Sequence, residues 1–342
     1  MKGAISKDRP VSRPRQPFSL RVAAAAPLLL FAALLGAFSV LSPQFLTTDN
    51  LTNILVQASS TAIVATGMTF VLLTAGVDLS VGAIMFVAAA VAGKMTVHGA
   101  SLTMALLAML AVGIAFGALN AYFITRQKIL PFIVTLATLY VGRGFALWMT
   151  ETRAINLPES FLHLGSARTL GVPAPLWLLA GVIVLAQATL SFTPFGRQLY
   201  AVGVDREIAR KAGVRVDALL TTVYVISGAC AALGAIVSLT QLGAVSPTFG
   251  QNREFTAIAA AVLGGTSLFG GRGNVFPGTL LGAVLMQTVE NGLVILNADP
   301  YLYPLVTSAI IFLAVLLDSL RSGALKKALR RRIRIAGNPK LP

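Results

Sequence analysis

The sequence predicts an all-α polytopic membrane protein, and three observations support this prediction. Hydrophobic residues make up 56% of the 342-residue chain and charged residues only 11%, whereas a soluble domain carries about 25% charged residues. The mean hydropathy is +0.80. Between Leu51 and Gly93 the only charged side chain is Asp78. This stretch is long enough for two helices of the roughly 20 residues that span a bilayer.

About ten segments are apolar and long enough to be transmembrane helices, so we expect one membrane domain over 22–320. The segment 255–270 is short and rich in alanine and glycine, and we expect it to be broken or re-entrant. A basic, disordered tail over 1–21 and a second basic tail over 321–342 flank the domain. The predicted spans are 22–41, 52–75, 78–96, 101–125, 130–149, 175–193, 218–240, 255–270, 277–296 and 304–320.

The basic residues predict the orientation of these spans. The formal net charge is +15. If the N-terminus is cytoplasmic, ten crossings return the C-terminus to the cytoplasm, and 22 of the 27 lysines and arginines then lie on that side. This distribution follows the positive-inside rule, which the opposite orientation violates. The positive charge is therefore a topology signal with affinity for anionic lipid, and it argues against nucleic-acid binding.

Motifs for catalysis and cofactor binding are absent from the sequence. The glycine-rich stretch 264–273 lacks the lysine of a phosphate-binding loop, so we interpret its Gly271 and Gly273 as a tight cytoplasmic turn beside closely packed helices. Two histidines and the single Cys230 form none of the usual metal or nucleophile motifs. We therefore expect no catalytic residue, metal or cofactor in this chain, and transport remains as the activity.

Polar side chains inside the spans are candidate functional residues, because a charge at the bilayer centre costs about 2.5–3.5 kcal/mol on insertion scales. Asp78 lies between Gly76 and Gly82. We interpret it as the N-cap of the third helix at the cytoplasmic boundary, with the glycines forming the turn. Arg143 lies in the outer half of the fifth span, where it either snorkels outward or pairs with a carboxylate.

Three further polar residues, Gln287, Glu290 and Asn291, gather near the outer end of the ninth span. Two interpretations stay open. Together with Arg143 they line a translocation pathway, or they form hydrogen bonds between helices, as amide side chains commonly do in membranes.

The predicted cytoplasmic loop 194–217 contains the signals of one complete short helix. Asp205 is a good N-cap, and Glu207 lies in the first turn, where negative charge suits the helix dipole. Gly213 lies where a left-handed C-terminal cap is expected. The helix carries the apolar residues Ile208 and Ala209. A helix this short is unstable alone in water, so it needs a docking surface, either a partner protein or the membrane surface.

Several motifs in order resemble the permease subunits of bacterial ABC importers of the ribose and arabinose type. The resemblance extends from about Leu41 to Arg321, with two departures: Ala75 replaces a usual glycine and Glu290 replaces a usual asparagine. The motifs are Leu73–Gly82 (LTAGVDLSVG), Leu130–Leu136 (LPFIVTL), Thr193–Arg197 (TPFGR), Ala257–Ser267 (AIAAAVLGGTS) and Asn291–Leu293 (NGL).

The resemblance implies a role for the short helix. In such importers a cytoplasmic helix with an E-A-A-x-x-x-G pattern sits in a groove of the ATPase. Glu207, Ala209 and Gly213 match this pattern, and Ile208 replaces its first alanine. Asp205 and these four residues are therefore the candidate ATPase-coupling residues, with a membrane-surface anchor as the alternative for a helix this basic.

The resemblance also implies an assembly in the bacterial inner membrane. Two permease copies would associate with an ATPase that carries two nucleotide-binding halves and uses ATP and Mg²⁺. A periplasmic or extracellular binding protein would deliver a small polar solute, in particular a monosaccharide such as ribose. This chain would hydrolyse nothing itself. The rival functions are a carrier driven by an ion gradient and a passive channel.

Overall fold

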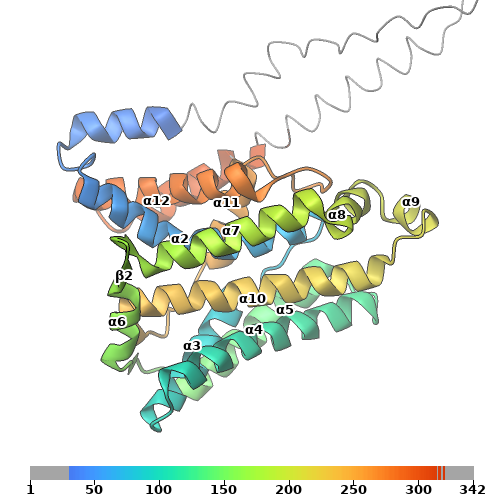
Figure 1. Cartoon of the computed structure of the whole chain (residues 1–342), viewed down its shortest axis with the longest axis horizontal. Helices are drawn as coiled ribbons and strands as arrows, with labels where there is room; N and C mark the ends of the chain where they lie inside the picture. The colour runs from blue at the N-terminus through green and yellow to red at the C-terminus, as the bar shows by residue number, and fades with distance from the viewer. Residues whose placement is uncertain (1–30, 314, 317–318, 320–342) are drawn as a thin grey trace, which may run out of the picture.

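The computed structural model describes residues 31–313, 315–316 and 319, and most of this part is helical (Figure 1). Apolar helices at Phe31–Leu41 and Leu302–Leu313 flank the remaining elements. The elements are α2 (Thr48–Leu73), α3 (Val81–Val97), α4 (Leu102–Thr125), α5 (Pro131–Thr150), β1 (Ile155–Asn156), α6 (Glu159–Ser166), β2 (Arg168–Thr169), β3 (Val172–Pro173), α7 (Ala174–Phe192), α8 (Pro194–Val204), α9 (Arg206–Lys211), α10 (Val216–Leu242), β4 (Ala244–Val245), α11 (Arg253–Leu263), the π-helix η1 (Val275–Thr279) and α12 (Leu280–Ile295).

Six helices in the described part of the chain are long and apolar enough to cross a membrane: α2, α4, α5, α7, α10 and the continuous run η1–α12. The prediction of an all-α polytopic membrane protein is confirmed at this level. The number of ten spans and the side on which each terminus lies stay predictions. The tails predicted over 1–21 and 321–342 lie outside the described residues, as do parts of the first and last predicted spans.

Helices α2 and α10 form the centre of the fold, and they approach closely because small residues lie at their contact. A methyl group at Gly67 of α2 would collide with Cys230 on α10. On the other side of α10, a methyl group at Gly113 or Gly117 of α4 would collide with the α10 backbone. Small residues at such crossings let helix backbones pack directly in a membrane, where burial of apolar surface gives no net drive.

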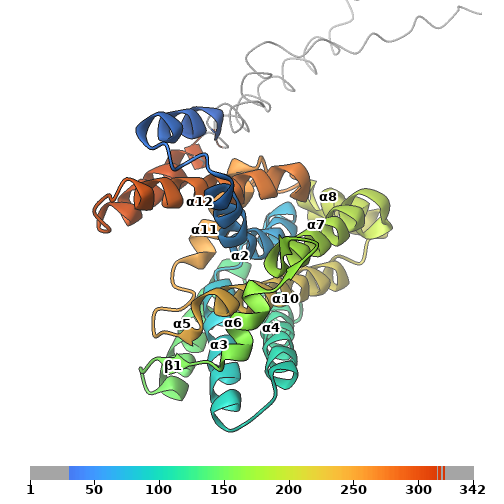
Figure 2. The ribbon, with the colours of Figure 1, turned by 60° about the vertical axis from the view of Figure 1, so that its left-hand side comes forward.

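The segment predicted outside the membrane, from Thr150 to Pro175, folds over one end of α10 (Figure 2). Strand β1 pairs antiparallel with β4, with Ile155 opposite Val245. Helix α6 buries Phe161 completely and packs against α10. Strands β2 and β3 pair as a small hairpin. Together these elements fasten the end of α10 to the start of α7.

Helix α11 has 11 residues and is shorter than the helices that it packs against, α2 with 26, α12 with 16 and α3 with 17. It ends at Leu263, well before the limit of the predicted span 255–270, and the glycine-rich loop follows, as a broken helix requires. Its first turn lies against the start of α3, where a methyl group at Gly82 would collide with Glu254 and the Gly250 carbonyl. The side chain of Arg253 reaches Thr61, halfway along α2.

Candidate functional site

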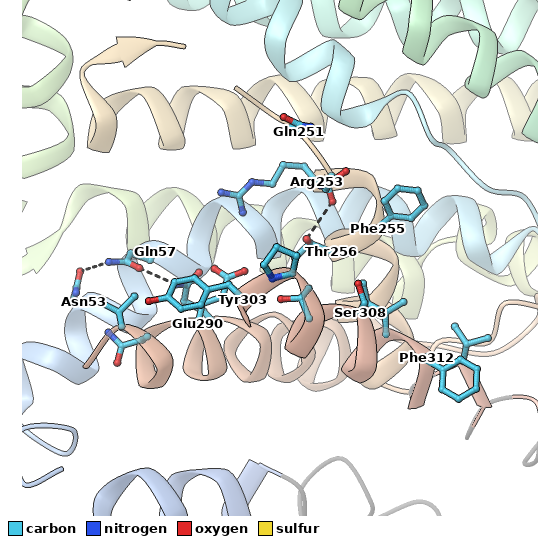
Figure 3. Close-up of a pocket in the computed structure, with 18 residues that line it drawn as sticks. Asn53, Gln57, Gln251, Arg253, Phe255, Thr256, Glu290, Tyr303, Ser308 and Phe312 are labelled. Carbon is cyan, nitrogen blue, oxygen red and sulfur yellow. Dashed lines mark hydrogen bonds between the residues drawn. The ribbon is translucent and has the colours of Figure 1, made fainter. Parts of the chain in front are cut away.

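A polar cavity in the described part of the chain has a volume of about 920 Å³, at the upper end of the range for small-molecule sites. Helices α2, α11, α12 and Leu302–Leu313 form its walls (Figure 3). Its lining residues are Asn53, Gln57, Gln251, Asn252, Arg253, Phe255, Thr256, Gln287, Glu290, Asn291, Val294, Tyr303, Pro304, Thr307, Ser308, Ile311, Phe312 and Val315.

Amide side chains connect α2 to α12 along this cavity. Gln287 Nε2 donates to Gln57 Oε1 at 2.8 Å, and Gln57 Nε2 donates in turn to Asn53 Oδ1 at 3.0 Å. Asn50 and Asn291 exchange two hydrogen bonds of 3.0 and 2.9 Å through their amides. Gln287 and Asn291 thus line the cavity and also bond a neighbouring helix, while their place in a translocation pathway stays a prediction.

Two charged residues face the same cavity. The Arg253 guanidinium donates from Nη1 to Thr61 Oγ1 at 3.0 Å, which holds it across from α12. Glu290 is half-buried on α12, and Arg253 acts on its carboxylate electrostatically. The two do not form an ion pair in the described part of the chain. Sequence reasoning missed Arg253 because it falls between predicted spans.

Arg143 does not join the other three candidate pathway residues. Its guanidinium carbon lies 5.5 Å from the centre of the Phe86 ring on α3, a cation–π arrangement, and it interacts electrostatically with Glu254. Arg143 forms no ion pair in the described part of the chain, so its pairing with a carboxylate stays a prediction. Glu254 is only 4% exposed, and its Oε2 atom has no hydrogen-bond partner in the described chain. The sequence placed this residue one position outside a span, so its burial was not predicted.

The prediction that Asp78 is the N-cap of the third helix is wrong. Helix α3 begins at Val81, and Ser80 occupies the cap position. The fully buried Asp78 carboxylate instead accepts hydrogen bonds from the Ser80 amide at 3.0 Å and the Ser80 hydroxyl at 2.5 Å through Oδ1. Its Oδ2 accepts from the Ser227 hydroxyl of α10 at 2.7 Å. A buried carboxylate needs several hydrogen-bond donors. The start of α3 supplies those of Ser80, and Ser227 of α10 supplies a further one.

The Asp78 group extends to two further helices. Asn120 Nδ2 on α4 donates to Ser80 Oγ at 2.8 Å, and Thr138 Oγ1 on α5 donates to Asn120 Oδ1 at 2.7 Å. The loop between α2 and α3 is thereby fastened to α4, α5 and α10. This is a structural role, and it places no part of Asp78 in the cavity.

The turn glycines predicted at this loop have different roles. Gly76 is needed for space, because a methyl group there would come within 2.8 Å of Tyr224 Oη. The left-handed residue of the turn is Ala75, with φ +56°. Gly82 lies inside the first turn of α3 and makes room for Glu254. In the separate glycine-rich loop 264–273, Gly271 and Gly273 have positive φ angles of +69° and +152°, as expected for a tight turn.

The short helix predicted in the long loop is present as α9. Asp205 is its N-cap, and Oδ1 accepts from the amides of Glu207 and Ile208 at 2.8 and 2.9 Å. Gly213 has φ +87° and ends the helix in the left-handed conformation. Ala209 is buried, whereas Ile208 is 66% exposed. The helix therefore presents an apolar residue outward from a rigid, capped turn.

Contacts fasten α8 and α9 to the end of α2. Arg206 Nη2 donates to the Thr74 carbonyl at 2.9 Å, and the Gly271 amide donates to the Leu73 carbonyl at 3.0 Å. Tyr200 Oη donates to the Gly273 carbonyl at 2.8 Å. Burial raises the pKa of Tyr200, so the phenol stays protonated as this donor. Carbonyls at a helix C-terminus lack partners within the helix and favour positive charge, which explains Arg206.

Together these features define a class: a multi-pass helical permease in which one central helix joins a polar cavity to a capped surface helix. Residues 50–316 match the family described as the branched-chain amino acid transport system / permease component. The chain belongs to this family.

Relatives include sugar permeases. The chain is 38% identical over 297 residues to the ribose import permease protein RbsC of Escherichia coli K12, covering 85% of this chain and 92% of RbsC. The D-allose transport system permease protein AlsC of the same organism is 36% identical over 296 residues, with coverage of 86% and 90%. The fructose import permease protein FrcC of Rhizobium meliloti is 35% identical over 326 residues, with coverage of 91% and 89%. No solved structure gives a significant match.

Proposed function

We propose that this chain is the membrane-spanning subunit of an ATP-driven ABC importer. The observation that carries the proposal is the position of α2. One end of this helix is bonded to the loop that carries α9, because the Thr74 carbonyl accepts from Arg206, while the neighbouring Leu73 carbonyl accepts from Gly271 of the glycine-rich loop. The other half of α2 lines the polar cavity with Asn53 and Gln57. A partner that binds α9 can therefore act on the cavity through a single helix.

The solute that suits this cavity best is a monosaccharide such as ribose. The lining combines amides, hydroxyls, two opposite charges and the rings of Phe255 and Tyr303, a mixture typical of sites for small polar ligands. The names of the relatives RbsC, AlsC and FrcC support a sugar.

Energy for transport comes from an ABC ATPase with two nucleotide-binding halves, which binds ATP and Mg²⁺, while this chain hydrolyses nothing and binds no cofactor. Asp205, Glu207, Ile208, Ala209 and Gly213 are the proposed contact with that ATPase. The exposed Ile208 side chain fits this role, since a protein groove covers an apolar residue that water does not solvate well.

The complete importer contains two copies of this chain and a periplasmic or extracellular binding protein. It lies in the bacterial inner membrane with both termini in the cytoplasm and ten spans in each copy. The positive-inside distribution of the basic residues supports this orientation. The membrane-surface alternative for α9 is weaker than the sequence implied, because Arg206 bonds Thr74 and Lys211 pairs with Glu207 at 2.9 Å.

Reconstitution in liposomes tests the proposal. With its ATPase and binding protein, the chain should accumulate ribose, allose or fructose only when ATP is supplied. Glu207→Ala should lower this uptake about tenfold and reduce co-purification of the ATPase, whereas Glu159→Ala, at an exposed position in α6, should change neither. Uptake by the chain alone along a proton or sodium gradient would establish the carrier instead. Flux with neither ATP nor a gradient would establish the channel.

A further inference from the structure

The polar groups that line the cavity divide into two kinds. Gln287 and Asn291 are committed to α2 through the amide hydrogen bonds described above. Gln57 is also committed, since its carbonyl accepts from Gln287 and its amide donates to Asn53. Rearranging these groups for a solute would first break bonds that hold two helices together. These three amide groups are therefore better suited to forming the wall of the cavity than to binding a solute in it.

Glu290 is of the other kind. It lies on α12 between Gln287 and Asn291, and in the described chain its carboxylate has neither a hydrogen bond nor an ion pair. It lines the cavity, near Tyr303 in the close-up (Figure 3). A half-buried carboxylate without a donor is poorly solvated and gains from any hydroxyl that enters.

Arg253 provides the complementary group across the cavity. Its hydrogen bond to Thr61 fixes the direction of the guanidinium, and the guanidinium acts on Glu290 electrostatically without contacting it. An arginine carries five N–H donors, so most of its donors remain for other partners. A gap bounded by fixed donors on one side and a free acceptor on the other therefore lies within the cavity.

A hydroxyl group matches this gap, because it accepts a hydrogen bond from a guanidinium and donates one to a carboxylate. A charged solute is attracted by one of the two residues and repelled by the other, so neither sign of charge gains from the pair as a whole. A neutral hydroxyl group gains a hydrogen bond from each residue. We infer that Glu290 is the specificity-determining hydrogen-bond acceptor for a neutral polyhydroxylated solute that lies between Glu290 and Arg253. This inference rests on the proposed function and narrows its substrate class.

Glu290→Gln tests the inference, because the amide keeps the size of the side chain and removes its charge. In liposomes with the ATPase and binding protein, and with ribose, allose and fructose as probes, we expect uptake to fall about tenfold or more. That is the effect of losing one charge-assisted hydrogen bond. Stimulation of the ATPase by the binding protein should stay within twofold. Glu290→Asp retains the carboxylate and should recover uptake several-fold over Glu290→Gln. Glu159→Gln, at an exposed position in α6, is the matched control and should transport normally.

The alternative outcomes separate the two levels of the argument. If the unaltered importer takes up a probe and Glu290→Gln does so equally well, the inference is wrong and the proposed function stands. Equal loss of uptake and ATPase stimulation in both Glu290 variants would assign a purely structural role and also overturn it. If the unaltered importer takes up none of the three probes with ATP, the proposed function fails as stated, and the inference fails with it.

Discussion

The two ends of α2 are held in contrasting ways. At one end, backbone carbonyls of Leu73 and Thr74 accept hydrogen bonds from the Gly271 amide and the Arg206 guanidinium. At the other end, Asn50 and Gln57 bond α12 through amide side chains, beside an open cavity.

Under the proposed function, the first end of α2 is the transmitting end and the second is the binding end. Backbone contacts hold their geometry closely, because the chain itself would have to deform for them to change. Amide side chains can change rotamer and exchange one partner for another, including a solute hydroxyl. A rigid helix between the two ends lets a displacement at the first become a rearrangement at the second.

Gly213→Pro should have the largest effect, because it disrupts the C-terminal cap of α9, the helix that is bonded to the transmitting end of α2. Proline fixes φ near −65°, whereas Gly213 has φ +87° and its amide donates to the Arg210 carbonyl. We expect more than a tenfold loss of ATP-dependent uptake, measured in liposomes, with normal insertion into the membrane. Gly213→Asn is the control, since asparagine tolerates the left-handed conformation, and it should retain most uptake. Normal uptake by the proline variant would remove α9 from the mechanism.

Arg206→Ala should have the next largest effect and isolates the link between α9 and α2. The variant loses the 2.9 Å hydrogen bond to Thr74 but leaves the caps of α9 intact. We expect the ATPase to co-purify normally while the solute transported per ATP hydrolysed falls several-fold. Arg206→Lys keeps one charged donor, so the solute transported per ATP hydrolysed should lie between the values of the unaltered chain and of Arg206→Ala. An unchanged ratio in Arg206→Ala would show that force reaches α2 by another route.

Asn291→Leu probes the binding end and should act mainly on stability. It removes the donor to Asn50 Oδ1, at a cost of about 1–3 kcal/mol for an unsatisfied polar group, while Asn50 Nδ2 still donates to the Phe45 carbonyl. The expected result is a Tm several degrees lower in a thermal-shift assay, with ATPase co-purification unchanged. Replacing Asn50 and Asn291 together by leucine removes both polar groups and should recover much of the loss. No recovery in the double variant would contradict this account of the amide pair.

The contrast also explains how far the sequence could predict the molecule. Helix α9 is specified by neighbours in the chain, because Asp205 and Gly213 cap the same few residues. The cavity is specified by contacts between residues near 53, 253, 290 and 308, and helical periodicity contains no information about such pairings. The prediction therefore succeeded for the local helix, while it grouped Arg143 with residues of a cavity that Arg143 does not line and omitted Arg253, which does line it.

Asp78 shows the same limit from the opposite side. The local pattern of an aspartate two residues before a helix favours a cap, and the Ser80 amide does donate to it. The second carboxylate oxygen is used by Ser227, 149 residues away. No local signal distinguishes a surface cap from a buried carboxylate that also fastens α10.

Ala75→Gly should have the smallest effect and would refine the transmitting end. Alanine at φ +56° carries a steric penalty of about 1–2 kcal/mol that glycine avoids, offset in part by the greater entropy of glycine in the unfolded chain. We expect a gain of about 1 kcal/mol or less, visible as a small rise in Tm. Gly76→Ala is the contrasting control and should lower Tm, because its methyl group approaches Tyr224 Oη. A lower Tm for Ala75→Gly would contradict the assigned strain.

The packing of Cys230 against Gly67 has a practical consequence for measuring motion. The chain has one cysteine, and that thiol is buried between α10 and α2, so water-soluble thiol reagents should not reach it in the folded protein. New cysteines at exposed Val204 and at Asn53 in the cavity would then carry spectroscopic labels alone. The distance between two such labels, followed through the ATP cycle, reports whether the end of α8 and the cavity half of α2 move together.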